Sequence, residues 1–317
     1  MSLAADQETM PLILGIDIGG TKTHLRAEGR GIRQDRILST AVWRERDWDA
    51  DASRLLAMAS ELVQGAEIDA IGIGAHGCDD ASECDAFQAA FAARSPVRTA
   101  VVNDAELMPL AMGLHGQIGL VAGTGSIAVC RTASGGMLVA GGWGWIIGDE
   151  GSAASIVREA ARAVALYMDT GGSKDEPLAA LLFEALEIPR PARIGSAISC
   201  LGSATAVGGY AHLVFEAATL GSHVAQGVIR DGGQALAALV QRLDARGAGA
   251  SEVVAGGGVI VAQPLLWHAF VEALADDARH ISPHLFGGNP VEGACRLAAT
   301  LAASSDRSRN EASATRI

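Results

Sequence analysis

The sequence predicts an α/β protein made of two related halves with a cleft between them. Its 317 residues suit about two domains of roughly 150 residues each. Short β-rich segments alternate with amphipathic helical segments early in the chain, which is typical of a sheet covered by helices. The order of three strands, helix, strand, helix and strand then starts again at residue 119. We therefore expect two lobes of the same design.

The expected strands of the first half are apolar runs bounded by Gly, Pro or charged residues. They cover residues 12–17, 23–28, 36–42, 70–75 and 97–103. Leucine, alanine and valine recur at a spacing of about 3.6 over residues 53–63, which predicts a helix there. A second helix is expected over residues 82–93. These helices would connect the later strands of the first sheet.

The second half repeats the three-stranded meander and then becomes mostly helical. Strands are expected at residues 119–122, 126–131, 137–141 and 252–255, and helices at 151–167, 177–186, 205–218, 222–246 and 264–275. A last helix over 289–302 is expected to pack back on the first half. The predicted lobes are residues 11–112 with the C-terminal helix 289–303, and residues 113–288, with mobile tails at 1–10 and 304–317.

Charge and cysteine content disfavour several classes of function. Lys and Arg number 24 against 36 Asp and Glu, a net charge of −12 that repels nucleic-acid backbones and anionic lipid surfaces. No run of about 18 apolar residues is free of glycine breaks or charges, so no transmembrane helix is expected. The five cysteines include no CxxC pair and suit neither a disulfide framework nor a metal cluster. We expect a cytoplasmic protein with neither a nucleic-acid nor a membrane partner.

The first motif is GIDIGGTKT, residues 15–23. Its turn, Gly19 to Lys22, lacks bulky side chains at Gly19 and Gly20, so backbone N–H groups of Gly20, Thr21 and Lys22 can converge on phosphate oxygens. Asp17 at the strand end would face a divalent cation through water, because Mg²⁺ keeps most of its hydration shell. An ordinary Gly-Gly hairpin is the alternative.

Two further glycine turns follow the same design. GLVAGTGSIAV, residues 119–129, places a turn of Gly123, Thr124, Gly125 and Ser126 between two strands. One such turn in each half is hard to attribute to turn geometry alone, and together they would form a phosphate clamp. VVAGGGVI, residues 253–260, leaves room at Gly256, Gly257 and Gly258 for an adenine, a ribose or a phosphate. Tight packing of strand on helix explains this third motif equally well.

Asp104 is the candidate catalytic residue. It follows an apolar strand in VVNDAELM, residues 101–108, and opens a helix. An Asp in that position is commonly a helix N-cap with a structural role. Its place at the carboxyl end of a strand, where α/β sheets bind ligands, favours catalysis instead.

These segments carry a family resemblance. GIDIGGTKT, VVNDA, LVAGTGS and VAGGGV, in this order, resemble the phosphate-1, central-aspartate, phosphate-2 and adenosine segments of the superfamily of actin, Hsp70 and sugar kinases. Residues 141–152, GGWGWIIGDEGS, are similar to the signature of the N-acetylglucosamine and glucosamine kinase branch of the BadF/BadG/BcrA/BcrD ATPases. The likeness extends from residue 12 to about 300. It implies two actin-like, ribonuclease H-like lobes with nucleotide and sugar in the interdomain cleft.

The resemblance implies a role for each matched residue. Asp17 would hold Mg²⁺, Asp104 would accept the proton of the attacking sugar hydroxyl, and the three glycine turns would bind ATP. The sugar pocket would be formed, besides Asp104, by Gly77, Cys78, Asp79, Gly142, Trp143 and Asp149. The implied activity is phosphorylation, at O6, of an amino sugar such as N-acetylglucosamine or glucosamine, by a homodimer.

The sequence departs from the N-acetylglucosamine kinases at two sugar-binding positions. Ile127 stands where the turn after phosphate 2 carries an Asn, and the early loop STAVWRERDWDA contains no Asn. Sites that hydrogen-bond a substrate group reject analogues that lack it. Without these two Asn side chains, the sequence does not determine which sugar is the substrate. Two other functions remain as alternatives: an activator-type ATPase of the same family, which needs cluster-binding cysteines, and a catalytically silent nucleotide or sugar sensor.

Overall fold

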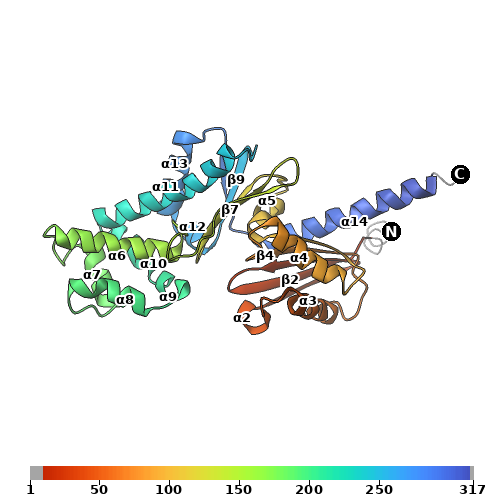
Figure 1. Cartoon of the computed structure of the whole chain (residues 1–317), viewed down its shortest axis with the longest axis horizontal. Helices are drawn as coiled ribbons and strands as arrows, with labels where there is room; N and C mark the ends of the chain where they lie inside the picture. The colour runs from red at the N-terminus through yellow and green to blue at the C-terminus, as the bar shows by residue number, and fades with distance from the viewer. Residues whose placement is uncertain (1–9, 315–317) are drawn as a thin grey trace. The chain divides into compact units, whose positions relative to one another are not determined.

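The structure, a computed structural model, describes residues 10–314; the side chains of residue 277 and residues 305–314 are outside that description. The chain divides into two compact units (Figure 1). Unit 1 comprises residues 1–116, 134–137 and 288–317, and unit 2 comprises residues 117–133 and 138–287. The tails expected at 1–10 and 304–317 lie outside the described residues at positions 1–9 and 315–317.

Unit 1 contains a five-stranded mixed sheet of order β3-β2-β1-β4-β5. Its strands are β1 (Ile13–Ile18), β2 (Lys22–Gly29), β3 (Ile32–Ser39), β4 (Ala70–Ala75) and β5 (Arg98–Asn103). β1 is antiparallel to β2 and parallel to β4, and β4 is parallel to β5. The carboxyl ends of β1, β4 and β5 therefore share one edge, where Ile18 pairs with Ala75 and Ala75 with Asn103.

Helices cover both faces of this sheet. α3 (Trp48–Leu62) and α4 (Ala81–Ala92) share one hydrophobic cluster with Leu14, Ile16 and Ile73. α14 (Val291–Ala314) packs on the other face, where Ala298 contacts Ile13 and Ala70. The shorter helices of unit 1 are α2 (Thr40–Trp43), η1 (Asp104–Glu106) and α5 (Leu107–Ala111). The C-terminal helix thus belongs to the same core as the first strands.

Unit 2 repeats the central arrangement with the strand order β10-β9-β6-β7-β8. The strands are β6 (Ile118–Ala122), β7 (Ser126–Arg131), β8 (Met137–Gly141), β9 (Glu252–Gly256) and β10 (Ser282–Leu285). β6 is antiparallel to β7 and parallel to β9, as β1 is to β2 and β4. Each unit therefore places a hairpin turn after its central strand, as the repeated motifs predicted.

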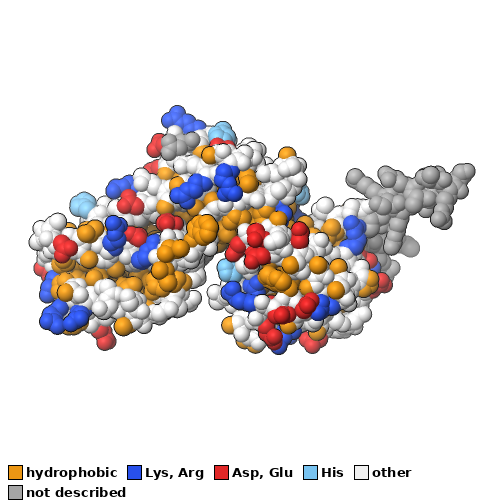
Figure 2. Space-filling view, viewed as in Figure 1, with side chains coloured by type: hydrophobic (Ala, Val, Ile, Leu, Met, Phe, Trp, Pro, Cys, Tyr) orange, Lys and Arg blue, Asp and Glu red, His pale blue; other side chains and the backbone are white. Residues whose placement is uncertain are grey.

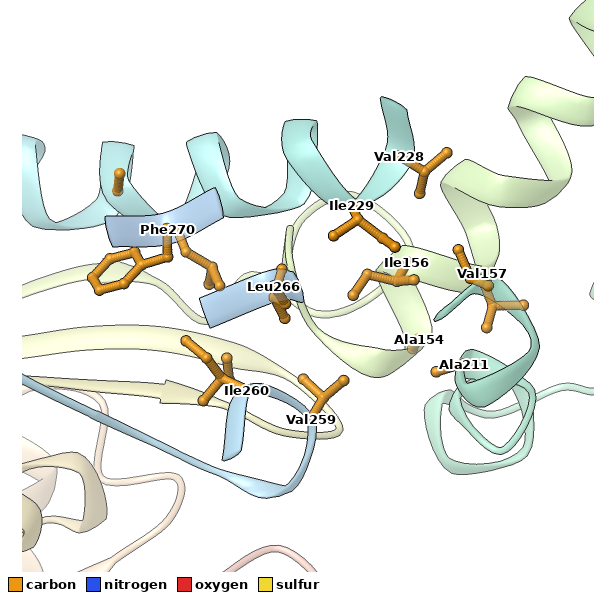
Figure 3. Close-up of a cluster of buried hydrophobic side chains, with 14 of the residues drawn as sticks. Ala154, Ile156, Val157, Ala211, Val228, Ile229, Val259, Ile260, Leu266 and Phe270 are labelled. Carbon is orange, nitrogen blue, oxygen red and sulfur yellow. The ribbon is translucent and has the colours of Figure 1, made fainter. Parts of the chain in front are cut away.

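A large helical layer covers the sheet of unit 2. It consists of α6 (Ala153–Asp169), α7 (Pro177–Ala185), η2 (Pro191–Arg193), α8 (Ile194–Cys200), α9 (Ala204–Gly208), α10 (Ala211–Thr219), α11 (His223–Ala245), α12 (Gly258–Ala262) and α13 (Pro264–Asp277). Figure 3 shows part of this core, where Ile156, Ile229 and Leu266 meet from α6, α11 and α13. Burial of such side chains stabilises each by about 1.5–3 kcal/mol relative to exposure. The core fixes the ends of β6 and β9.

Several element boundaries differ from the sequence prediction. β3 ends at Ser39, whereas a strand was expected over 36–42, because Thr40 starts helix α2 and donates its hydroxyl to the Gly19 carbonyl at 2.8 Å. The helix expected at 53–63 begins earlier, at Trp48, with Asp47 as its N-cap. The helix expected at 205–218 is split into α9 and α10 around Gly208 and Gly209, which lower helix propensity.

Further elements were not predicted in their observed form. The short helices η2 and α8 and the edge strand β10 were missed, and α14 continues to Ala314 through residues 304–314, where a tail was expected. The missed elements are short, so their periodicity is weak. Of the described helices, none combines the length and the apolar character that crossing a membrane requires. On the face seen in Figure 2, acidic and basic side chains lie interspersed among hydrophobic ones.

Candidate active site

The turn between β1 and β2 is tightly fixed. The Gly19 N–H donates to the Lys22 carbonyl at 3.0 Å, and the Thr40 N–H donates to the Thr21 carbonyl at 2.9 Å. Gly20, Thr21 and Lys22 are exposed. A Cβ atom built on Gly20 would lie 3.4 Å from His76 Nε2, so His76 lies beside this turn. The turn therefore presents its backbone to solvent on a rigid support.

Two carboxylates lie at the shared strand edge of unit 1. Asp17 is 6% exposed near the end of β1, and the Asp104 side chain is 17% exposed just after β5. Burial, and then the charge of Asp104, raises the pKa of Asp17 to about 7, against an opposing effect of Lys22. Burial, and then the charge of Asp79, raises the pKa of Asp104 to about 7 as well. Neighbouring carboxylates that resist ionisation favour a bound cation.

This pair suits Mg²⁺ better than a metal held by protein alone. No group of three or more His, Cys, Asp and Glu side chains that could hold a metal ion occurs among the described residues. Mg²⁺ needs only one or two carboxylates when phosphate oxygens and waters complete its octahedron. No described residue donates a hydrogen bond to the buried Asp17 carboxylate, which leaves its oxygens available for that ion.

Asn103, and not Asp104, caps the helical turn that follows β5. The Asn103 Oδ1 accepts the Ala105 N–H at 2.9 Å, and the Glu106 Oε1 accepts the Asn103 N–H at 3.1 Å, which completes a capping box. The structural role that the sequence left open for Asp104 is therefore filled by its neighbour. Backbone hydrogen bonds from Ala105 and from Asp104 itself to the Asp104 carboxylate oppose the rise of its pKa.

Asn103 also holds the segment from Gly77 to Asp79 against Asp104. Its Nδ2 donates to the Cys78 carbonyl at 2.9 Å and to Asp79 Oδ1 at 3.3 Å. Gly77 has a φ of +78°, which a residue with a side chain adopts only with strain. Of the three predicted sugar-pocket residues here, Cys78 is fully buried. Its contact with Cys84 and its burial raise the pKa of the Cys78 thiol, so this thiol is no nucleophile.

Two basic side chains near Asp104 were missed by sequence reasoning. His76 Nδ1 lies 3.8 Å from Asp104 Oδ2. Arg44, just after α2, has a side chain that is 5% exposed, and the charge of Asp104 acts on it. The position of His76 directly after β4 was a signal that could have found it. Arg44 lies in a charged run, RER, which reads as a solvated surface segment.

In unit 2, the second and third glycine motifs meet. β6 and β9 are parallel neighbours, with Val121 opposite Gly256. A Cβ atom on Gly123 would lie 3.6 Å from the Gly258 N, and one on Gly257 would lie 2.6 Å from the Ala122 carbonyl oxygen. Gly257 also has a φ of +106°. The two glycine segments, Gly123–Ser126 and Gly256–Gly258, therefore lie side by side. Where their backbones come closest, at Gly123 and Gly257, neither segment has a side chain.

The signature loop of residues 141–152 is tied to the same turn. Asp149, with a φ of +56°, accepts the Gly144 N–H at 3.2 Å, and a Cβ on Gly125 would lie 2.8 Å from Asp149 Oδ2. Burial raises the pKa of this carboxylate. Ser126 donates its hydroxyl to the Glu150 carbonyl at 2.8 Å. Gly142 and Trp143 are exposed, Trp143 by 75%.

Two cavities of unit 2 have no predicted site residue in their linings, although Glu150 and Gly151 of the signature loop line the second. One, of about 780 Å³, lies between α6 and α8 and has Arg158, Arg162 and Arg190 among its lining residues. The other, of about 460 Å³, lies between α6 and α11. Neither includes a residue of the glycine turns. The site residues of unit 2 are therefore surface turns and not the walls of these cavities.

Residues 14–295 match the BadF/BadG/BcrA/BcrD ATPase family. The chain belongs to this family. A curated relative, N-acetylmuramic acid/N-acetylglucosamine kinase of Clostridium acetobutylicum, is 30% identical over 177 residues, which are 52% of this chain and 57% of the relative. The matched segment therefore spans little more than half the length of that relative.

Solved structures resemble the fold over nearly the whole chain. A Chromobacterium violaceum protein proposed to be an N-acetylglucosamine kinase has a TM-score of 0.64 and 21% identity, over 90% of this chain and 98% of its own. A ROK family glucokinase of Streptomyces griseus, solved with glucose and AMPPNP, has a TM-score of 0.55 and 18% identity, over 91% and 99%. The chain therefore has the two-lobe, actin-like α/β fold that the motifs predicted.

Proposed function

We propose that this protein is an ATP-dependent kinase that phosphorylates a hydroxyl group of an amino sugar. The observation that carries the proposal is the placement of Asp104. It lies at the strand edge that also bears Asp17 and the β1–β2 turn, and its neighbour Asn103 performs the capping role. Family membership and the C. acetobutylicum relative support the same reaction.

Each unit contributes a different part of the proposed machinery. In unit 1, the Gly19–Lys22 turn binds phosphate oxygens, and Asp17 is the residue that would hold Mg²⁺. In unit 2, the Gly123–Ser126 turn binds phosphate and the Gly256–Gly258 segment accepts the adenosine. Bound Mg²⁺ supplies charge neutralisation on the phosphates. Backbone N–H groups suit this task because they need no reorganisation as charge develops.

Asp104 is the proposed general base. The sugar hydroxyl gives its proton to the Asp104 carboxylate while its oxygen forms a bond to the γ-phosphorus, and the bond from that phosphorus to the β–γ bridging oxygen breaks to release ADP. The pKa of Asp104, about 7 in the free protein, suits a group that accepts and releases a proton near neutral pH. A cation beside Asp17 would favour the ionised base.

The proposed acceptor is O6 of N-acetylglucosamine, glucosamine or a related amino sugar. In unit 1, Gly77, Asp79 and Asp104 are the residues proposed to bind the sugar, and in unit 2 they are Gly142 and Trp143. Cys78 contributes its backbone, since its side chain is buried. Asp149 contributes by accepting the Gly144 N–H, which holds the loop of residues 141–152 in place. A homodimer is the assembly we propose.

The decisive experiment replaces Asp104 with Asn. Sugar-dependent ADP release should fall by roughly 10²–10⁴-fold, the usual contribution of a general base. Asp85→Asn, on the exposed surface of α4, is the matched control and should retain full activity. Binding of a non-hydrolysable ATP analogue to Asp104→Asn, measured by calorimetry, should persist.

The assay should cover N-acetylglucosamine, glucosamine, glucose and N-acetylmuramic acid. Turnover that survives Asp104→Asn would remove the base assignment. ADP release by the wild-type protein that no sugar stimulates would contradict the kinase and favour an ATPase or a sensor.

A further inference from the structure

Arg44 carries a buried positive charge that forms an ion pair with Asp51 but makes no side-chain hydrogen bond. Its side chain is 5% exposed, and its Nε makes no hydrogen bond. Asp51, fully buried in α3, approaches it with Oδ2 at 3.7 Å, which is too long for a hydrogen bond, while Asp51 Oδ1 accepts the Glu45 N–H. No described group accepts a hydrogen bond from the guanidinium. Burying such donors without a partner is costly.

The backbone at Arg44 is firmly held beside the β1–β2 turn. The Arg44 N–H donates to the Thr40 carbonyl at 3.0 Å, and Thr40 in turn hydrogen-bonds to the Gly19 and Thr21 carbonyls. Trp43 donates its Nε1–H to Thr23 Oγ1 at 3.0 Å. Helix α2 thus fixes the place of Arg44 relative to the proposed phosphate turn, and the unpaired donors do not follow from a loose loop.

The guanidinium lies against the proposed sugar site. A Cβ atom on Gly77 would lie 3.8 Å from Arg44 Nη2, so the absence of a side chain there leaves space next to the guanidinium. Burial lowers the pKa of Arg44, and the charges of Asp51 and Asp104 oppose that effect. Arginine nevertheless stays protonated in proteins. A permanent cation therefore adjoins the residues that would bind the acceptor.

We propose that Arg44 binds a carboxylate on the substrate, so that the preferred acceptor is an amino sugar carrying an acidic substituent. This inference rests on the proposed sugar kinase function. A guanidinium presents paired N–H donors that match a carboxylate in a bidentate arrangement. Arg44 also lies in STAVWRERDWDA, the loop that lacks the sugar-binding Asn of the N-acetylglucosamine kinases.

The charges around the site are mixed, and Arg44 is a buried cation among them. Asp17, Asp79 and Asp104 would repel a substrate carboxylate. Arg44 offsets this repulsion at the position where Gly77 leaves room. A neutral sugar would offer the guanidinium no charged acceptor beyond its ion pair with Asp51, and sites with polar groups that lack hydrogen bonds discriminate against such ligands.

The first test needs no variant. Wild-type protein is assayed with N-acetylmuramic acid, with the carboxamide of that sugar, and with N-acetylglucosamine. The value of kcat/KM should be about tenfold or more higher for the acid than for its carboxamide, because only the acid offers a charged acceptor. Equal values for the acid and the carboxamide would overturn the proposal.

The second test replaces Arg44 by Gln and by Lys, with Arg36→Gln as the matched control. Arg36 is an exposed arginine of β3 that pairs with Glu61, in the same unit. Arg44→Gln should raise KM for N-acetylmuramic acid about tenfold or more while KM for N-acetylglucosamine changes little, and Arg44→Lys should restore part of the preference. The control should match the wild type.

Three outcomes would contradict the assignment of Arg44. An equal loss with the acid and the neutral sugar would indicate a structural role. A raised KM for ATP alone would assign the guanidinium to the nucleotide phosphates. Calorimetric binding of N-acetylmuramic acid that is unaffected by Arg44→Gln would exclude the contact. If no sugar is phosphorylated, but binding of the acid still depends on Arg44, the proposed kinase function and the acceptor role fail, and only the contact of Arg44 with the carboxylate stands.

Discussion

The two units share a strand order but equip the same strand edge differently. Unit 1 gathers ionisable side chains there, with Asp17, Asp104 and Arg44 all largely buried. Unit 2 offers backbone from Gly123 to Ser126 and from Gly256 to Gly258. The one buried carboxylate among its predicted site residues, Asp149, is engaged by the Gly144 N–H. The scaffold is repeated, while the chemistry depends on what each unit attaches to it.

This contrast has an energetic side. The carboxylates of unit 1 are held with raised pKa values, so the folded protein resists their ionisation. The turns of unit 2 instead depend on glycine conformations, such as Gly257 at a φ of +106°. Unit 1 should therefore respond to pH and charge substitutions, and unit 2 to added side-chain atoms.

The largest effect is expected from Gly72→Ala in unit 1. A Cβ atom there would lie 2.2 Å from the Ala294 carbonyl oxygen and 2.8 Å from the Ala298 N, so α14 must move away from β4. We expect a loss of about 3 kcal/mol or more in the free energy of unfolding, measured by urea titration. Gly195→Ala, in α8 of unit 2, is the control: nothing lies within 4 Å of its Cβ.

Gly195→Ala should instead raise the free energy of unfolding, because alanine is favoured over glycine in a helix by about 1 kcal/mol. If Gly72→Ala were as stable as the wild type, the close packing of α14 on the sheet would be wrong.

Gly257→Ala should come next and should affect the nucleotide. The added Cβ would lie 2.6 Å from the Ala122 carbonyl oxygen in a left-handed backbone conformation, so the segment beside the Gly123 turn must shift. We expect binding of a non-hydrolysable ATP analogue to weaken about tenfold to a hundredfold, equivalent to about 1.4–2.7 kcal/mol. Gly258→Ala, whose Cβ meets nothing within 4 Å, should bind within about twofold of the wild type. Equal binding by both variants would argue against this segment as a nucleotide contact.

Elements fixed by neighbouring residues in the chain were predictable from the sequence, and features that depend on distant residues were not. The glycine turns, β4 and β7 were predicted because residues adjacent in the chain determine them. The sequence left a capping role for Asp104 open as an alternative, because Asn103 and Asp104 are both suitable caps, and the structure gives that role to Asn103. The burial of Arg44 could not be predicted, because it depends on Asp51 in α3 and on the space at Gly77.

A third prediction concerns stability in the absence of ligands. The pKa of Asp104 is raised from 3.8 to about 7 in the folded protein. The folded state therefore binds more protons than the unfolded state between about pH 4 and pH 7, and stability should fall as pH rises through that window. Asp104→Asn should remove this loss and exceed the wild type in unfolding free energy by on the order of 1–3 kcal/mol at pH 8.

Chemical denaturation at pH 5 and pH 8 measures this difference, and Asp85→Asn should show none of it. A stabilisation of Asp104→Asn that is equal at both pH values would mean that ionisation is not the cause.

The smallest predicted effect is a displacement of the pH–rate profile. Only ionised Asp104 can accept the hydroxyl proton, so kcat/KM should rise about tenfold per pH unit below about pH 7 and level off above it. The charge of Asp79 is one cause of the raised pKa of Asp104. Asp79→Asn should therefore move the midpoint of the profile to lower pH by a fraction of a unit, whatever it does to the plateau rate. Profiles with a shared midpoint would show that Asp79 does not act on the base, and a wild-type midpoint near pH 4 would mean that burial does not raise its pKa.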